Sequence, residues 1–454
     1  MKNTAKATTL EHKFPLLAFE HDFLISKQAD ITACFRVKLP EIFTVASAEY
    51  DSIHASWHKA IKTLPDYCVV HKQDWYIREE YEAQLNREDQ TFLSRSYERH
   101  FNERPFLNHS CYLFLTQTTR ERLRRQSNFS SLCRGSLIAK EKLDKEVSHR
   151  FGEAVNQFER ILNDSSFVHM ERLTEAELLG DDEDPGLLAR YFSLSHSKTG
   201  TLEDMYLGAE EMRIGNKRLC IHTLSDTEDF PNTAQTGSRY EKLSTDRSDC
   251  LLSFAAPVGL LLSSNHIYNQ YLFIDNSEEN LKKFEKTARN MHSLARYSRS
   301  NQINKEWIEQ YLNEAHSYGL SSIRAHYNVM TWSDDPDELK RLKNDVGSGI
   351  ALMECKPRHN TVDVATLFWA GIPGNAGDFP SEESFYTFIE PALCFFTQET
   401  NYQNSPSPFG IKMADRLTGK PIHLDISDLP MKKGIITNRN KFVLGPSACR
   451  VSQN

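Results

Sequence analysis

The sequence lacks long apolar runs and paired cysteines. Its most apolar run, LLSFAAPVGLLL at 251–262, contains Pro257. Because a membrane-spanning helix needs about 20 apolar residues, we expect a buried strand pair there instead. Nine cysteines are scattered along the chain without a C-x-x-C pair, which excludes the usual ligand spacing of a zinc site. Dispersed cysteines of this kind suit a reducing cytoplasm.

An excess of positive charge is also missing. The net charge is −8, and hydrophobic and aromatic residues make up 39% and 11% of the 454 residues. This balance gives no general argument for binding to nucleic acid or to an anionic membrane. It is typical of a folded protein with room for two or three domains.

Strand-like and helix-like patterns alternate along the chain, which predicts a mixed α/β fold. Residues 15–40 have the pattern of a β-hairpin, because apolar and polar residues alternate from Ile31 to Val37. Other strands are predicted at 67–70, 111–115, 266–275, 321–332 and 364–373. Helices are predicted over 50–61, 140–164, 277–297, 303–320, 335–345 and 381–393. In the helix over 303–320, Trp307 belongs to the predicted apolar stripe.

The last residues of the sequence resemble the beginning of a phosphate-binding loop. Residues 441–444 have the pattern of a short apolar strand, and Gly445 fits the first position of G-x-x-x-x-G-K-[ST]. The second glycine and the lysine would fall at Arg450 and Val451, so the pattern stops halfway. A simple turn is the alternative. The candidate nucleotide-binding residues of this incomplete loop are Gly445, Pro446 and Ser447.

The genetic code suggests how the pattern could continue. The residues from Cys449 to Gln453 can be encoded TGT-CGG-GTA-AGT-CAA. Read from the third base, this string gives TCG-GGT-AAG-TCA, which encodes Ser-Gly-Lys-Ser, the missing half of the loop. We therefore expect residues 448–454 to be out of frame, and the nucleotides after codon 447 test this expectation.

The chain resembles the N-terminal half of the TraG family of conjugation-system ATPases from Bacteroides-type mobile elements, which are related to the ATPases of type IV secretion. The resemblance extends from Met1 to about Ser447. The stretches that carry it include HKFPLLAFEHDFLISKQADITACFRVKLPE (12–41), FLSRSYERHFNERPFLNHSCYLFLT (92–116), IHTLSDTEDF (221–230), NHIYNQYLFID (265–275) and FGIKMADRLTGKPIHLDISDLPMKKGIITNRNKFVLGPS (409–447).

The resemblance implies three parts and a function. Residues 1–135 and 136–404 would form two α/β subdomains, and 405–454 would begin a RecA-like ATPase domain. The residues at 407–426 independently have the pattern of a β-hairpin with Thr418 and Gly419 at its tip. Intact relatives use ATP and magnesium; this chain, with its incomplete loop, would use no cofactor, have no catalytic residues and hydrolyse no ATP. A stand-alone adaptor of the conjugation apparatus is the alternative.

The resemblance also implies partners and a location. The expected partners are other conjugation or type IV secretion subunits, with self-association in the intact protein. The expected location is the cytoplasm, with peripheral binding to the cytoplasmic face of the inner membrane and without a transmembrane segment. Direct binding to nucleic acid is left open.

Other clusters of functional residue types are weaker candidates. His54 and His58 have the spacing of two metal ligands on one helix, but an exposed helix face explains them better. A basic cluster could contact phosphates of DNA or lipid, although a solvated or partner-docking surface is the stronger interpretation. Its members are Arg120, Arg122, Arg124 and Arg125. Acidic residues that could be solvated or bind a cation are Asp181, Asp182, Asp184, Glu210, Glu211, Asp246 and Asp249.

Overall fold

The computed structural model describes residues 9–83, 91–135, 137–138, 144–181, 184–195, 202–208, 211–240, 251–295, 297–407 and 410–442. The chain divides into two compact units: unit 1 comprises residues 1–79 and 107–401, and unit 2 comprises residues 80–106 and 402–454. Strands from both sides of residue 135 share one sheet. The domain boundaries expected at residues 135 and 404 stay predictions.

Unit 1 is built on one large sheet. Its strand order is β1-β2-β3-β5-β4-β12-β13-β9-β8-β7. Three further strands pair with members of this series: β6 with β3, β14 with β9, and β15 with β13. The central strand β12 runs antiparallel to both neighbours, so that Tyr271 lies opposite His71 of β4 and His326 of β13. The mixture of helices with a large antiparallel sheet confirms the predicted fold class.

The strands of the sheet are as follows: β1 (Leu16–Glu20), β2 (Phe23–Ser26), β3 (Ile31–Lys38), β4 (Cys68–Glu80), β5 (Pro105–Gln117), β6 (His169–Arg172), β7 (Met205–Leu207), β8 (Met212–Ile214), β9 (Lys217–Leu224), β12 (His266–Ile274), β13 (Ser322–Ser333), β14 (Arg358–Asn360) and β15 (Phe385–Phe388). A separate two-stranded sheet pairs β10 (Gly237–Arg239) with β11 (Leu251–Ser253).

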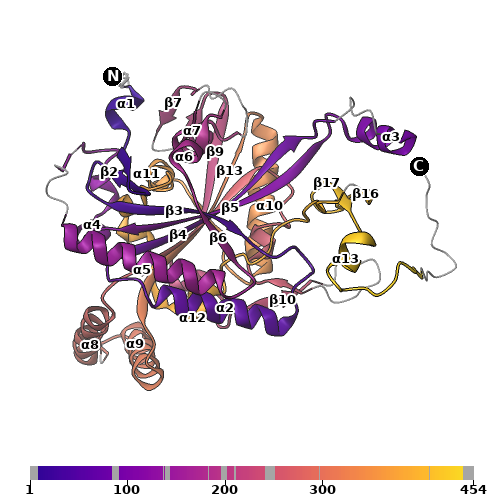
Figure 1. Ribbon diagram of the computed structural model, residues 1–454. Helices are drawn as coiled ribbons and strands as arrows, with labels where there is room; N and C mark the ends of the chain where they lie inside the picture. The colour runs from indigo at the N-terminus through magenta and orange to yellow at the C-terminus, as the bar shows by residue number, and fades with distance from the viewer. Residues whose placement is uncertain are drawn as a thin grey trace. The chain divides into compact units, whose positions relative to one another are not determined.

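Helices cover both faces of the sheet, as Figure 1 shows for α2, α5 and α12 on one side and α6 and α7 on the other. The first layer consists of α2 (Ser47–Ile61), α5 (Lys145–Asn163), α10 (Pro336–Leu352) and α12 (Ile389–Leu393), and the second of α6 (Glu175–Leu179), α7 (Gly186–Ser193) and α11 (Val364–Ala370). The buried Trp57 ring of α2 packs edge-on against Phe158 and Phe396. Each face of the sheet therefore has its own apolar core.

Several sequence predictions about unit 1 are confirmed and others are wrong. The hairpin at 15–40 is present as β1, β2 and β3, and α5 matches the described part of the helix predicted over 140–164. The predicted strand at 364–373 is wrong, because residues from Val364 to Ala370 form α11. A short, uniformly apolar run has no periodicity that separates a buried strand from a buried helix. The strand pair expected at 251–262 is also wrong, since β11 is followed by the 3₁₀ turn Ala256–Val258.

The two helices predicted over 277–297 and 303–320 are present as α8 (Ser277–Leu294) and α9 (Arg299–Tyr318), which pack against each other as an antiparallel pair. Asn276 caps α8 by accepting a hydrogen bond from the Glu279 backbone N–H at 3.0 Å, and Gly319 ends α9 in the left-handed region. Trp307 is 61% exposed, so its assignment to the packed stripe was wrong. Across the described helices, none combines the length and the apolar character required to span a bilayer.

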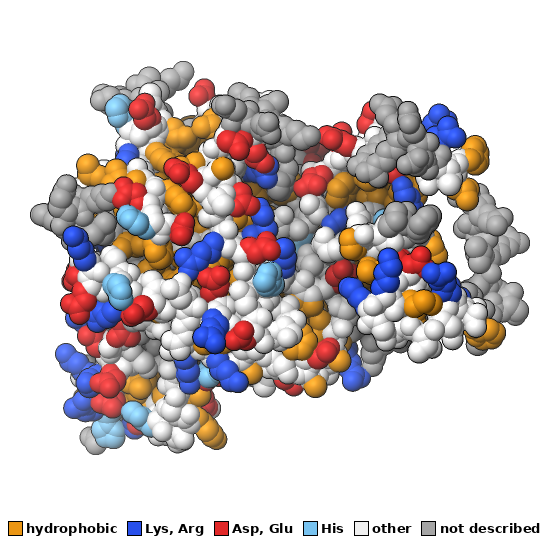
Figure 2. Space-filling view, viewed as in Figure 1, with side chains coloured by type: hydrophobic (Ala, Val, Ile, Leu, Met, Phe, Trp, Pro, Cys, Tyr) orange, Lys and Arg blue, Asp and Glu red, His pale blue; other side chains and the backbone are white. Residues whose placement is uncertain are grey.

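Short helices complete unit 1, namely α1 (Leu10–Lys13), α4 (Arg120–Leu123) and the 3₁₀ turns Ser127–Phe129, Thr227–Asp229, Ala376–Asp378 and Ser381–Glu383. Figure 2 shows Lys and Arg side chains interspersed with Asp and Glu side chains over the visible face. Exposed pairs such as Arg160–Asp164 and Lys282–Glu278 are further examples of this mixing. The surface therefore agrees with the balanced charge of the sequence.

Unit 2 contains α3 (Phe92–Phe101), the strands β16 (Ile411–Ala414) and β17 (Pro421–Leu424), and α13 (Asp428–Lys432). β16 and β17 pair antiparallel, which confirms the predicted hairpin, and Gly419 at its tip has φ of +73°. Lys441 and Phe442, the described part of the strand predicted at 441–444, lie outside any strand.

Candidate functional site

The predicted loop residues Gly445, Pro446 and Ser447 lie outside the described residues. The structure describes the segment that precedes these residues, up to Phe442. Asp425 follows β17 and accepts backbone hydrogen bonds from Ser427 and Asp428 at 2.9 and 2.8 Å, and from Leu429 at 2.8 Å. These bonds lower the pKa of Asp425 well below its ordinary range, that from Ser427 most of all. The Asp425 side chain thus holds the first residues of α13 next to the end of β17.

The hairpin of unit 2 packs on α3, which comes from the chain segment between β4 and β5. Glu98 of α3 is buried, forms an ion pair with Lys412 of β16, and accepts a hydrogen bond from the Tyr81 hydroxyl at 2.8 Å. The Tyr97 hydroxyl donates to the Met413 carbonyl oxygen at 3.0 Å. Two segments more than 300 positions apart therefore form one folded unit.

A buried polar network lies on the central strands of unit 1. The Asp74 carboxylate of β4 accepts hydrogen bonds from Gln270 at 2.6 Å and Thr397 at 2.6 Å, is paired with Lys72, and lies 3.0 Å from His109 Nε2. Burial opposes its ionisation, but Lys72 and His109 keep the pKa of Asp74 well below its ordinary range. Because its oxygens already have partners, this carboxylate is suited to joining strands rather than to acid–base chemistry.

Glu399 is another buried carboxyl group of unit 1. Its Oε1 accepts hydrogen bonds from the backbone N–H and the hydroxyl of Ser253 at 2.9 and 3.0 Å. Burial raises the pKa of Glu399 to about 7, against the opposing effect of the Ser253 hydrogen bonds. This group therefore changes protonation near neutral pH.

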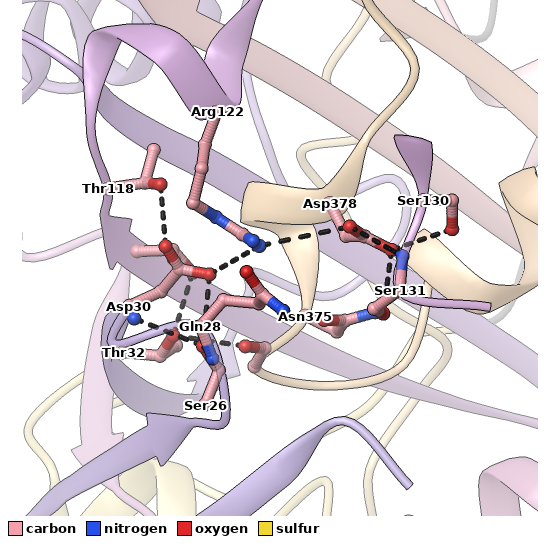
Figure 3. Close-up of polar contacts among 12 residues, drawn as sticks. Ser26, Gln28, Asp30, Thr32, Thr118, Arg122, Ser130, Ser131, Asn375 and Asp378 are labelled. Carbon is pink, nitrogen blue, oxygen red and sulfur yellow. Dashed lines mark hydrogen bonds and ion pairs between the residues drawn. The ribbon is translucent and has the colours of Figure 1, made fainter. Parts of the chain in front are cut away.

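A second buried network joins β3, α4 and the loop near residue 378 (Figure 3). The Arg122 guanidinium is 2% exposed, lies 2.7 Å from Asp30 and 3.9 Å from Asp378, and points between them. The Asp378 carboxylate also accepts hydrogen bonds from the Ser130 hydroxyl at 2.7 Å and the Ser131 backbone N–H at 2.8 Å. Burial raises the pKa of Asp378, although Arg122 lowers it.

The predicted basic cluster is therefore not one exposed surface. Arg122 is buried in the network just described, which corrects its interpretation as a solvated residue. Arg120 and Arg124 both pair with Glu279 of α8, at 2.9 and 3.3 Å. Arg125 is half-buried, and its carbonyl oxygen accepts a hydrogen bond from the Ser381 N–H at 2.8 Å.

His54 and His58 do not lie on an exposed helix face, which corrects the interpretation of that pair. Both are half-buried and contact Glu390 of α12: His54 Nε2 lies 2.8 Å from its carbonyl oxygen, and His58 Nε2 lies 2.8 Å from its carboxylate. The two histidines attach α12 to α2. In the part of the chain that the structure describes, no group of three or more His, Cys, Asp or Glu side chains could hold a metal ion.

The acidic candidates are spread over several places. Asp184 pairs with Arg190 at 2.7 Å, and Glu211 lies 3.2 Å from Arg218. The backbone N–H of Asp181 donates to the carbonyl oxygen of Asp184. Those outside the described residues are Asp182, Glu210, Asp246 and Asp249. Of the described residues, Asp184 and Glu211 pair with arginines, and Asp181 forms a backbone hydrogen bond within a turn.

Two family models match parts of the chain. Residues 410–453 match the TraG P-loop domain, and residues 3–55 match a domain of unknown function described from a B. Theta gene (DUF3875). A comparison with curated proteins finds no match. The match at 410–453, which includes β16, β17 and α13, supports relating the chain to TraG-family conjugation proteins. The Bacteroides-type source and the out-of-frame ending stay predictions.

Sequence patterns did not indicate the buried networks. Lys72 and Asp74 belong to β4 and His109 to β5, and nothing in the sequence pairs them. Asp30 and Asp378 are likewise isolated in the sequence. An available signal was the presence of Lys72 and Asp74 between the apolar stretches CVV (68–70) and WYI (75–77), because a buried charge requires a partner.

Proposed function

We propose that this chain provides the N-terminal docking portion of a conjugation ATPase, and that residues 1–454 do not hydrolyse ATP. The observation that carries the proposal is the order of parts: unit 1 precedes a segment that matches the TraG P-loop domain at 410–453. In such an arrangement unit 1 is available to bind other subunits of the transfer apparatus, at the cytoplasmic face of the inner membrane.

The loop residues support the second half of the proposal. A phosphate loop needs a glycine at its sixth position, where the backbone approaches the phosphates, and then a lysine that reaches the terminal phosphates. Here Arg450 and Val451 occupy those positions. In a phosphate loop, a Cβ atom and a long side chain at the sixth position would occupy space that the phosphates require, and a valine in place of the lysine supplies no charge. We therefore propose no hydrolysis of magnesium-bound ATP at this loop.

ATP turnover by the purified 454-residue chain tests this proposal. Phosphate release is measured with magnesium and again with excess EDTA, across a series of protein concentrations and successive purification steps. We expect equal rates with and without magnesium. A magnesium-dependent rate that is proportional to protein concentration and persists at constant specific activity through purification would refute it.

A further inference from the structure

An open pocket lies beside the basic cluster in unit 1. It encloses about 710 Å³ and is lined by Arg124, Arg125, Gln126, Phe129, Arg134, Gly135 and Ser381. These residues come from the loop after α4, the 3₁₀ turn at 127–129, the turn that follows it, and the start of another 3₁₀ turn at 381. Its volume lies within the range of small-molecule sites, about 300–1,000 Å³.

The pocket carries a surplus of positive charge. Of its three arginines, Arg124 shares Glu279 with Arg120, whereas Arg125 and Arg134 form no ion pair with any residue described in the structure. Glu382, which follows the lining residue Ser381, accepts a hydrogen bond from the Ser127 backbone N–H at 2.7 Å. Two guanidinium groups therefore remain available for an anion.

An aromatic ring is part of the same pocket. Phe129 is 43% exposed, and the Arg134 guanidinium lies 4.3 Å from the centre of its ring. A guanidinium over an aromatic face is a favourable cation–π arrangement and holds both groups in place. The exposed part of the ring offers an apolar surface against which a planar group can pack.

The buried network beneath the pocket fixes the loop that carries these residues. Asp378 accepts hydrogen bonds from Ser130 and Ser131, and the Trp369 indole N–H donates to the Ser131 hydroxyl at 2.9 Å. Figure 3 shows Ser130 and Ser131 bonded to Asp378, which faces Arg122 of the neighbouring α4. The backbone of the pocket loop is thus held by buried contacts at Ser130 and Ser131 before a ligand binds.

We propose that this pocket binds a nucleotide, with Arg125 and Arg134 at the phosphates and Phe129 beside the base. Guanidinium groups present pairs of N–H donors that match phosphate oxygens, and they are always charged. An exposed ring next to unpaired arginines suits a ligand that joins phosphate to a planar apolar group. The site is made of residues other than 445–447 and needs no magnesium.

The test is binding of fluorescent methylanthraniloyl-ADP to the full chain in EDTA, which removes any contribution of a magnesium-dependent loop. We expect binding by the wild type, competition by unlabelled ADP and pyrophosphate, and little competition by adenosine. Arg125→Gln combined with Arg134→Gln should weaken binding by about tenfold or more, because two charge-assisted interactions are lost. Arg160→Gln, at an exposed position of α5, is the matched control and should bind like the wild type.

Several results would overturn this inference. They are absence of wild-type binding at about 1 mM ligand, equal affinity of the double variant, or equal competition by adenosine. Binding to phosphatidylglycerol vesicles through the same arginines, without ADP binding, would assign the pocket to a lipid headgroup instead. Equal melting temperatures of the three proteins exclude unfolding as the cause of a loss. The outcome is independent of ATP turnover, so this inference and the proposed function can fail separately.

Discussion

Replacing Glu399 with glutamine tests the electrostatics of the core of unit 1. This side chain is 1% exposed and is held by the backbone N–H and hydroxyl of Ser253. The amide of Glu399→Gln keeps an oxygen that can accept both hydrogen bonds, and it is neutral at every pH. The variant therefore resembles the protonated form of the wild type.

The expected size follows from the pKa of Glu399, which burial raises from 4.5 to about 7. Between these values the folded state keeps a proton that the unfolded state has lost, so wild-type stability decreases as pH rises through this window. Above about pH 7 the loss is complete. The two pKa values differ by about 2.5, which corresponds to about 3 kcal/mol of unfolding free energy.

Urea unfolding of the wild type and Glu399→Gln at pH 5 and pH 8 measures this effect. We expect similar free energies of unfolding at pH 5 and a variant that is more stable by up to about 3 kcal/mol at pH 8. Glu306→Gln, at an exposed position of α9, is the control and should not show this pH-dependent gain. If the difference between Glu399→Gln and the wild type is the same at both pH values, the reasoning is refuted.

Three further predictions concern the other buried pairs and unit 2. Lys72→Met should lower the free energy of unfolding by about 3–5 kcal/mol, because it leaves Asp74 without its buried cation. The double variant, Lys72→Met with Asp74→Leu, should lose less stability than the single variant in urea unfolding. A greater loss in the double variant would contradict this reasoning. Glu98→Gln should weaken the contact with Lys412 by about 1–2 kcal/mol. The backbone amide hydrogens of residues 411–424 should then exchange faster with solvent than in the wild type. Unchanged exchange rates would count against the contact. In the wild type, hydrogen exchange should be faster in unit 2 than in β12 and β13, and equal protection would show this expectation to be wrong.

The sequence predicted those elements whose pattern is local. Alternation from Ile31 to Val37 identified β3, and the spacing of apolar residues identified α5. It predicted only 67–70 of the longer β4, because His71, Lys72 and Asp74 look like exposed positions. Their partners come from β5, β12 and Thr397, so their burial depends on contacts that no local pattern contains.

Candidate sites were also difficult to predict, because the residues that contact each other lie far apart in the sequence. Arg122 appeared to belong to an exposed cluster, but its partners Asp30 and Asp378 lie 92 positions before it and 256 positions after it. His54 and His58 were interpreted as an exposed helix face because their partner, Glu390, lies more than 330 positions further along the chain. The hairpin at 411–424 was predictable because its turn, Asp415 to Gly419, is set by adjacent residues.

Docking is tested most directly by isolating this chain from cells that produce a complete conjugation apparatus and from cells that lack it. A tagged chain is cross-linked in each strain, and membranes are separated and solubilised before purification. The account predicts that the chain sediments with inner membranes and retains transfer subunits only when the apparatus is present. Identical fractionation in both strains, with no apparatus subunit retained, would contradict it.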